Sequence, residues 1–183
     1  MLGNDVVDLR LAKTQSNWRR KNYLSKIFSE DEQSLIHAAG DPDVFVWMMW
    51  SMKEASYKIV NRKTGLRFYK PKEFRCTFTL NGSRAEGLVH YLGETFLTYT
   101  EISPDYLHTI SFNTASDQQQ CKIICMQNAA DYPYQLQLAH PEIKLRKNIS
   151  GIPEIFLASS MISHCASVSH HGVFCFIIYL SGH

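Results

Sequence analysis

The sequence has no marked excess of either charge. Nineteen lysines and arginines stand against seventeen aspartates and glutamates in 183 residues, so the formal net charge is only +2. A protein that neutralises many phosphates along a nucleic acid needs a strongly basic composition. We therefore expect no nucleic-acid partner, and any basic surface must be local.

Long apolar runs and an export signal are also missing. The longest apolar run, Val173 to Leu180, is far shorter than the ~20 residues of a membrane-spanning helix. The N-terminus begins with the polar Gly3-Asn4-Asp5 rather than with a cationic segment followed by an apolar one. We therefore expect a cytoplasmic protein with no membrane partner.

Cysteine is scarce and irregularly spaced. The five cysteines are an odd number, and no export signal accompanies them, which indicates reduced thiols rather than a disulfide framework. At 45% hydrophobic residues, the chain can bury one sizeable core but is short for two independent domains. We predict a single domain over residues 1–183, with most of the cysteines in its core.

The N-terminal third is predicted to be mainly helical. Residues 2–7 have the pattern of a short buried strand. Asp8 could cap the first helix, and Ser29 with Glu32 forms a capping-box pattern for the second. The expected helices cover residues 8 to about 23, 29–39, and 42 to about 61, the last ending near Gly65.

Beyond residue 65 the pattern changes to short runs of β-branched and aromatic residues. Turn residues such as Asn81-Gly82 separate these runs, which is typical of strands. The expected strands are residues 74–80, 85–90, 96–100, 108–112 and 121–126. One more helix is expected within 135–146, and two further strands at 152–157 and 167–180.

The most informative segment runs from Trp50 to Lys58 and reads WSMKEASYK. On a helix, Glu54 and Lys58 are four residues apart and share one face, so a carboxylate and an ammonium are presented side by side. A surface ion pair of this spacing contributes only ~0.3–0.5 kcal/mol and is common. The pair alone therefore indicates no particular function.

An acidic residue also lies within the apolar N-terminal strand, in the sequence Gly3-Asn-Asp5-Val-Val7. A buried charge is costly unless something cationic meets it. Mg²⁺ prefers oxygen ligands and commonly takes one or two protein carboxylates, with water and substrate phosphates completing its shell. Asp5 and Glu54 would supply such a half-site. The alternative is that Asp5 only caps the following turn.

A third polar element, Ser167-Val-Ser-His170, precedes the apolar run at residues 173–180. His170 would therefore lie at the polar end of a buried strand, which is a usual place for a group that contacts a ligand. A histidine at a strand end is also often a satisfied surface or turn residue.

Taken in order, three motifs resemble those of the 4'-phosphopantetheinyl transferase superfamily: G-x-D at the N-terminus, W-S-x-K-E-A-x-x-K in a helix, and S-x-S-H before the last strand. The resemblance covers about residues 1–80 and 150–180. It implies an α+β fold in which an antiparallel sheet packs against helices, here with an extra β-rich section at about residues 80–150. It also implies transfer of the phosphopantetheine arm of coenzyme A to a serine of a carrier protein.

The resemblance further implies roles for the matching residues. Asp5 and Glu54 would bind Mg²⁺, and Glu54 would also take the proton of the carrier serine, directly or through a metal-bound water. Lys58 would stabilise the departing 3',5'-adenosine bisphosphate, while Lys53 and His170 would contact the phosphates of coenzyme A.

Two features bear on the subgroup. Val7 stands where larger members of the family carry a second acid, so the metal-site motif is more similar to that of the short holo-acyl-carrier-protein synthases. The chain length lies between those trimeric synthases and the longer enzymes built from a duplicated unit, so an oligomer is possible.

Acyl and peptidyl carrier proteins are acidic, and an acidic partner favours a basic docking surface. The helix expected after Asp5 is basic and is predicted to bind the carrier through Arg10, Arg19, Arg20 and Lys21. A solvated basic face without a partner is the alternative.

Two other classes of function remain open. One is a catalytically silent relative that binds coenzyme A or a carrier protein. The other is a zinc-binding module. Its candidate ligands are Cys121, Cys125, His164, Cys165, His170 and His171. Spacing argues against the zinc module, because Cys121 and Cys125 would lie ~13 Å apart along a strand.

Overall fold

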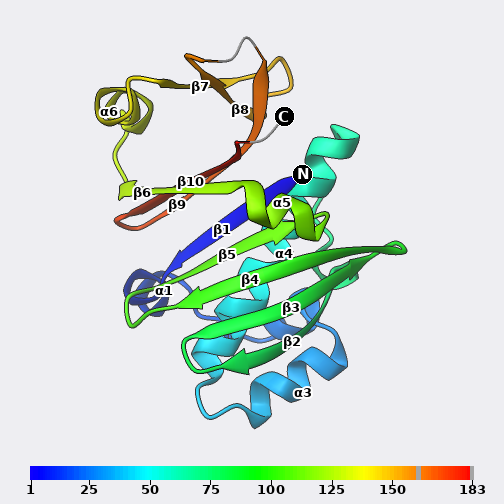
Figure 1. Cartoon of the computed structure of the whole chain (residues 1–183). Coiled ribbons are helices and arrows are strands. Elements are labelled where there is room, and N and C mark those ends of the chain that lie inside the picture. The colour runs from blue at the N-terminus through cyan, green and yellow to red at the C-terminus, as the bar shows by residue number, and fades with distance from the viewer. Residues whose placement is uncertain (160–161, 182–183) are drawn as a thin grey trace.

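Two five-stranded antiparallel sheets form the framework of the protein (Figure 1). The computed structural model describes residues 1–159 and 162–181. The first sheet has the order β1-β5-β4-β3-β2, with β1 at Leu2–Asp8, β2 at Arg75–Asn81, β3 at Arg84–Tyr91, β4 at Glu94–Ile102 and β5 at Tyr106–Phe112. The second has the order β6-β10-β9-β8-β7, with β6 at Cys121–Gln127, β7 at Ile143–Lys147, β8 at Pro153–Leu157, β9 at Ser163–His171 and β10 at Phe174–Leu180. The α+β class with antiparallel sheets is confirmed.

One long helix covers the first sheet. This helix, α4 (Pro42–Thr64), begins after the N-cap Asp41 and ends at Gly65, whose left-handed conformation (φ 69°) suits glycine. Its methionines and aliphatic side chains pack on β2 to β5 in the largest core cluster. The predicted end of the helix near Gly65 is confirmed. The short helix before it, α3 (Glu30–Ala38), has the predicted capping box between Ser29 and Glu32.

The helix predicted for residues 8 to about 23 is wrong. The structure instead has two short helices, α1 (Leu9–Gln15) and α2 (Tyr23–Ile27). Between them the chain turns so that the indole of Trp18 donates a hydrogen bond to Asp43 at 2.6 Å. Asn22 adopts a left-handed conformation with φ 65°, which a continuous helix does not allow. Tertiary contacts therefore interrupt the predicted helix.

The C-terminal third also differs from its prediction. The helix expected within residues 135–146 is α6 (Tyr132–Ala139), and residues 143–147 form β7. Pro141 stops the helix because it lacks an amide proton and restricts the preceding residue. The single strand expected at 167–180 is a hairpin of β9 and β10 around Gly172, whose φ is 57°. Two short helical segments were not predicted, η1 (Pro71–Glu73) and α5 (Ala115–Gln120).

Residues 80–150 are divided between the two sheets and do not form one added element. The strands β3, β4 and β5 complete the first sheet, while β6 and β7 are the outer strands of the second. All five cysteines are free thiols, as predicted, but Cys125 is exposed and only Cys76 and Cys175 are buried. Within the described ranges, every helix is too short or too polar to span a lipid bilayer.

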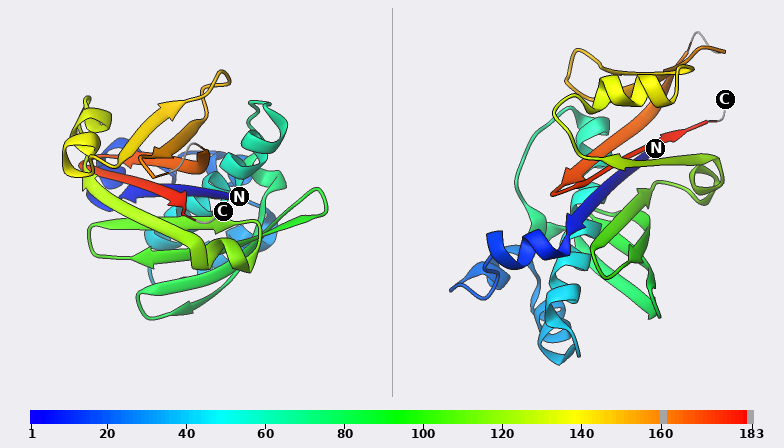
Figure 2. Two further views of the ribbon diagram at one scale, coloured as in Figure 1. Left: turned by 45° about the horizontal axis from the view of Figure 1, so that its top comes forward. Right: turned by 90° about the vertical axis from the view of Figure 1, so that its left-hand side faces the viewer.

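The two sheets meet where β1 lies beside β9 (Figure 2). Residues of β7 to β10 and of α6 form a smaller core on the face of the second sheet that α6 covers. Leu136 is the fully buried residue that α6 contributes to this core. The meeting of β1, β9 and α4 brings together residues that lie more than a hundred positions apart in the sequence.

Candidate active site

Gly3 allows β1 to lie directly against α4. A Cβ atom at this position would lie 2.1 Å from the carbonyl oxygen of Ala55, far inside van der Waals contact. The approach is supported by the hydroxyl of Ser51, which donates a hydrogen bond to the carbonyl oxygen of Asp5 at 3.2 Å. The glycine of the G-x-D motif is therefore what brings Asp5 to the helix turns that carry Glu54 and Lys58.

The side chain of Lys58 reaches across to Asp5. Its Nζ lies 3.6 Å from Oδ1 of Asp5 and donates hydrogen bonds to the carbonyl oxygens of Asn4 (2.6 Å) and Val168 (3.4 Å). Among the residues that the structure describes, Lys58 makes no ion pair with Glu54. The ordinary helical pair considered for these two residues is therefore absent, and the lysine joins β1, α4 and β9 instead.

Burial changes the proton affinity of both carboxyl groups. It raises the pKa of Asp5, while the charge of Lys58 and hydrogen bonds from Ser169 and Ser51 act in the opposite direction. For Glu54, burial and then the nearby charge of Asp5 raise the pKa to about 7, against the opposing charge of Lys58. Since Lys58 acts on both groups and the charge of Asp5 acts on Glu54, the two carboxylates share one electrostatic environment.

This arrangement fits a hard divalent cation. Among the described residues, one ammonium, that of Lys58, offsets these two partly buried carboxylates, and carboxylate oxygens are the ligands that Mg²⁺ prefers. Val7, where a third acid would stand, is buried in the apolar core. The residues that could hold the ion are thus Asp5 and Glu54, which leaves positions for water and phosphate oxygens.

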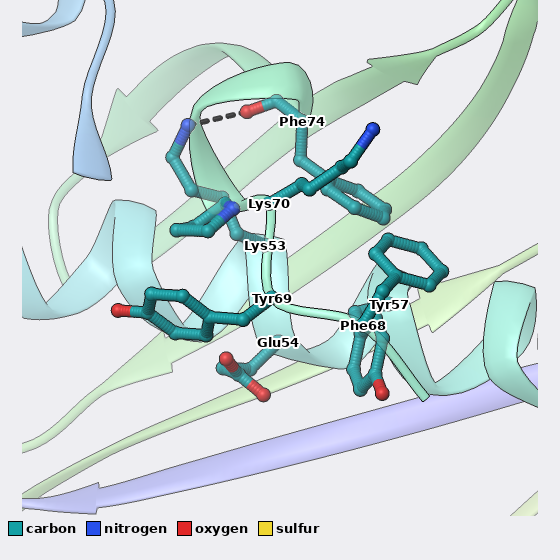
Figure 3. Close-up of a pocket in the computed structure, with 8 residues that line it drawn as sticks. Lys53, Glu54, Tyr57, Phe68, Tyr69, Lys70 and Phe74 are labelled. Carbon is teal, nitrogen blue, oxygen red and sulfur yellow. Dashed lines mark hydrogen bonds between the residues drawn. The ribbon is translucent and has the colours of Figure 1, made fainter. Parts of the chain in front are cut away.

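An aromatic cavity of about 210 Å³ adjoins Glu54 (Figure 3). Tyr57, Phe68, Tyr69 and Phe74 line it, and the carboxylate of Glu54 lies between Tyr69 on one side and Tyr57 and Phe68 on the other. Tyr69 is 68% exposed and forms part of the rim. A carboxyl group beside aromatic rings loses hydration, which is the physical cause of its raised pKa.

A second cavity, of about 120 Å³, adjoins Lys58 one helix turn further on. It is lined by three cationic side chains, those of Lys58, Arg62 and Arg67, and its described lining contains no carboxylate. Arg62 is held in place by hydrogen bonds to the carbonyl oxygens of Pro153 and Ala166. Among the described residues, Arg62 and Arg67 form no ion pair, and such cations suit a phosphorylated ligand. Arg62 and Arg67 were not predicted, although the i,i+4 spacing of Arg62 from Lys58 was visible in the sequence.

Lys53 also lines the aromatic cavity, but its ammonium group is held by other residues. Its side chain is 1% exposed, and its Nζ bonds both carboxylate oxygens of Glu32 at 2.8 Å and the carbonyl oxygen of Phe74 (Figure 3). Glu32 also accepts hydrogen bonds from the amides of Ser29 and Cys76. The structure therefore places the ammonium of Lys53 in a buried network that ties α3, α4 and β2 together, and its contact with a phosphate stays a prediction.

His170 also lies apart from the carboxylates. It is exposed on the face of β9 that looks toward α6, with its ring centroid 6.2 Å from that of Tyr132. Its neighbours Ser169 and His171 face β1 instead, because successive side chains of a strand point to opposite faces. Ser169 donates a hydrogen bond to Oδ1 of Asp5 at 3.1 Å, a contact that the sequence analysis missed.

The four basic residues predicted to bind a carrier are not on one helix. Arg10 is on α1 and pairs with Asp105 at 2.5 Å, whereas the other three lie in the turn before α2. Arg19 is engaged with Asp43 through two hydrogen bonds of 3.1 Å, while Arg20 and Lys21 are exposed. Arg19, Arg20 and Lys21 line an open surface pocket of about 470 Å³, together with Trp18 and Tyr23.

The zinc module finds no support in the structure. Over residues 1–159 and 162–181, no three His, Cys, Asp or Glu side chains lie close enough to form a metal site. Cys121 and Cys125 lie on β6 as expected, four residues apart along one strand.

Comparison with known proteins identifies the family of the chain. The family model described as the 4'-phosphopantetheinyl transferase superfamily matches residues 1–126 of the 183. A crystal structure of Thermotoga maritima holo-[acyl-carrier-protein] synthase is similar, with a TM-score of 0.43 and 16% identity, over 88% of this chain and 83% of that one. The comparison with curated proteins gave no match. The family match extends through β5 into β6 and so includes strands that the motifs alone did not reach. The chain belongs to the 4'-phosphopantetheinyl transferase superfamily.

Proposed function

We propose that the protein transfers the 4'-phosphopantetheine arm of coenzyme A to a serine of an apo-carrier protein in a Mg²⁺-dependent reaction. One observation carries this proposal. Asp5, Glu54 and Lys58 converge between an aromatic cavity and a cationic one. Coenzyme A has a matching distribution of charge along its length. Its phosphates form a charged end that suits the cationic cavity, and its long, largely uncharged arm suits the aromatic one.

The cationic cavity is the proposed site for the phosphates of coenzyme A. Lys58, Arg62 and Arg67 supply three positive charges there, and charge-assisted hydrogen bonds to phosphate are among the stronger polar contacts in proteins. The arm would then pass over Asp5 and Glu54 and extend into the aromatic cavity. This orientation places the β-phosphorus, the atom under attack, near the two carboxylates.

Asp5 and Glu54 are the proposed ligands of Mg²⁺. When bound, the ion would neutralise charge on the phosphoryl group under attack. Because Val7 is apolar and buried, two carboxylates would form the whole protein share of the site. That composition supports assignment to the holo-acyl-carrier-protein synthase type.

Glu54 is the proposed general base. In the metal-free protein, burial and then the charge of Asp5 raise the pKa of Glu54 to about 7. With Mg²⁺ bound, Glu54 would accept the proton directly or through a metal-bound water. The serine hydroxyl gives its proton to the Glu54 carboxylate and its oxygen forms a bond to the β-phosphorus. The bond from that phosphorus to the bridging oxygen breaks, and 3',5'-adenosine bisphosphate leaves with its new charge beside Lys58.

Arg20 and Lys21 are proposed to contact the acidic carrier, together with Arg10 and Arg19 after exchange of their present partners. Arg20 lies close enough to Tyr69, at the rim of the aromatic cavity, for its charge to affect the pKa of that tyrosine. A carrier held at this position would present its serine toward Glu54. The predicted phosphate contacts of Lys53 and His170 stay predictions outside this proposal, because the ammonium of Lys53 is bonded to Glu32 and the ring of His170 lies near Tyr132.

Mass spectrometry tests the proposal directly. Apo-acyl and apo-peptidyl carrier proteins are incubated with the protein, coenzyme A and Mg²⁺, and a matched sample contains a chelator. We expect one carrier to gain the mass of phosphopantetheine only when Mg²⁺ is present. Coenzyme A binding without modification of any carrier would instead identify a catalytically silent relative.

A further inference from the structure

One backbone edge of β1, the strand that carries Asp5, pairs with no neighbouring strand in the described part of the chain. Side chains of β9 accept hydrogen bonds from the amides at this edge instead. On one side β1 pairs with β5 along its whole length. On the other side, its amides point to side chains of β9. Asn4 N donates to Oγ of Ser167 at 3.1 Å, Val6 N to Oγ of Ser169 at 2.9 Å, and Asp8 N to Nδ1 of His171 at 2.9 Å.

These three contacts keep a constant register. Each pair of residues is separated by 163 positions, so β1 and β9 run parallel and in step, with every second residue in contact. The backbone carbonyls of β9 at this edge are bound by the helix instead, Val168 by Lys58 and Ala166 by Arg62. The seam between the sheets is therefore made of side chains from β9 and α4.

Ser169 differs from Ser167 in one respect. A serine hydroxyl can accept hydrogen bonds and donate one. The hydroxyl of Ser169 accepts from Val6 N and donates to Oδ1 of Asp5 at 3.1 Å. In the part of the chain that the structure describes, Ser167 accepts from Asn4 N and makes no hydrogen bond to Asp5 or Glu54. Ser169 is 5% exposed, so water competes little for its proton. Its acceptor contact directs its single donor to Asp5.

We propose that Ser169 is a positioning residue for the metal-binding carboxylate of Asp5. Together with Lys58 it holds Oδ1, and so fixes the rotation of the carboxylate that presents its other oxygen to the ion. Groups that hydrogen-bond a metal ligand typically alter metal affinity ~10- to 100-fold when they are removed. This inference rests on the proposed function, because it requires that Asp5 bind a divalent cation.

Direct binding of Mn²⁺, a paramagnetic substitute for Mg²⁺, tests the proposal without a turnover assay. Free Mn²⁺ is measured by electron paramagnetic resonance as the ion is titrated into the full-length protein. We expect Ser169→Ala to raise the dissociation constant about 10-fold. The matched control, Ser167→Ala, also removes an acceptor of a β1 amide and should leave the constant unchanged. Ser169→Thr keeps the hydroxyl and should restore most of the affinity.

The outcomes separate this inference from the proposed function. Equal weakening by Ser169→Ala and Ser167→Ala, with equal loss of thermal stability, would show that Ser169 only closes the strand edge. Unchanged affinity in Ser169→Ala, while Asp5→Ala abolishes binding, would overturn the positioning role and leave the metal site intact. Failure of the wild-type protein to bind Mn²⁺ would overturn both the metal assignment and this inference, and transfer measured by mass spectrometry would then decide the function by itself.

Discussion

The two cavities beside α4 lie on consecutive turns of one helix yet have opposite chemistry. Four aromatic rings line the cavity at Glu54, together with Lys53 and Lys70, whereas the cavity at Lys58 has three cations and no aromatic ring in its described lining. Between them lies the contact of Lys58 with Asp5. The difference indicates the direction in which an elongated ligand would lie, with its charged end toward Arg62 and Arg67 and its uncharged end toward Tyr69.

The largest expected effect is on catalysis at the aromatic end. Glu54→Gln keeps the size of the side chain but removes the base, so transfer should fall by about 10²- to 10⁴-fold. Binding of 3',5'-adenosine bisphosphate, at the cationic end, should be unchanged. Rates come from mass spectrometry of the carrier and affinities from calorimetry. Loss of both properties together would mean that the two ends are not separate.

The same substitution should stabilise the metal-free protein at alkaline pH. The pKa of Glu54 is raised from 4.5 to about 7 in the folded state, so the unfolded chain loses this proton at a lower pH. The free energy of unfolding therefore falls as the pH rises between those two values. Glu54→Gln removes this cost, which is up to about 3 kcal/mol at pH 8.

Urea unfolding at two pH values measures this effect. The free energy of unfolding of Glu54→Gln should exceed that of the wild type at pH 8 and match it at pH 4, where both states of the wild type hold the proton. An equal difference at both values would show that burial does not perturb Glu54.

At the cationic end, Arg67→Ala should weaken coenzyme A and 3',5'-adenosine bisphosphate alike. Loss of a hydrogen bond to a charged group costs roughly 1.5–3 kcal/mol, or about 10- to 100-fold in affinity. Lys63→Ala is the matched control, because Lys63 pairs with Glu94 and does not line the cavity. A similar loss in the control would mean that general charge, rather than this cavity, attracts the ligand.

The smallest effect distinguishes the arm from the nucleotide. Tyr69→Ala uncovers the aromatic cavity, and loss of about 40 Å² of apolar contact corresponds to about 1 kcal/mol. Coenzyme A should therefore bind about fivefold more weakly, while 3',5'-adenosine bisphosphate, which lacks the arm, should bind as before. Tyr134→Ala removes an exposed tyrosine of α6 and serves as the control. Equal weakening of both ligands by Tyr69→Ala would place the arm elsewhere.

Much of the framework could be predicted from the sequence, because local patterns set it. The capping box of Ser29 and Glu32 and the stop at Gly65 depend on residues close together in the chain, and both are confirmed. The helix across Trp18 was wrong because the indole finds its partner, Asp43, on another element. Periodicity cannot reveal such a distant contact.

The candidate site was predictable to a similar extent. Asp5, Glu54 and Lys58 follow from motifs, and the structure brings them together at one place. Ser169 was overlooked in favour of its neighbour His170, since the face that each presents depends on the register of β9, which distant strands fix. The ion pair of Lys53 could not be predicted either, because its partner Glu32 lies on a different helix.

The central claim is that Asp5 and Glu54 support transfer of phosphopantetheine from coenzyme A. Its most direct test is mass spectrometry of an apo-carrier after incubation with coenzyme A, Mg²⁺ and either the wild-type protein or its Asp5→Ala variant. The account predicts a carrier heavier by one phosphopantetheine with the wild type and an unmodified carrier with Asp5→Ala. Full modification by the Asp5→Ala variant would contradict it.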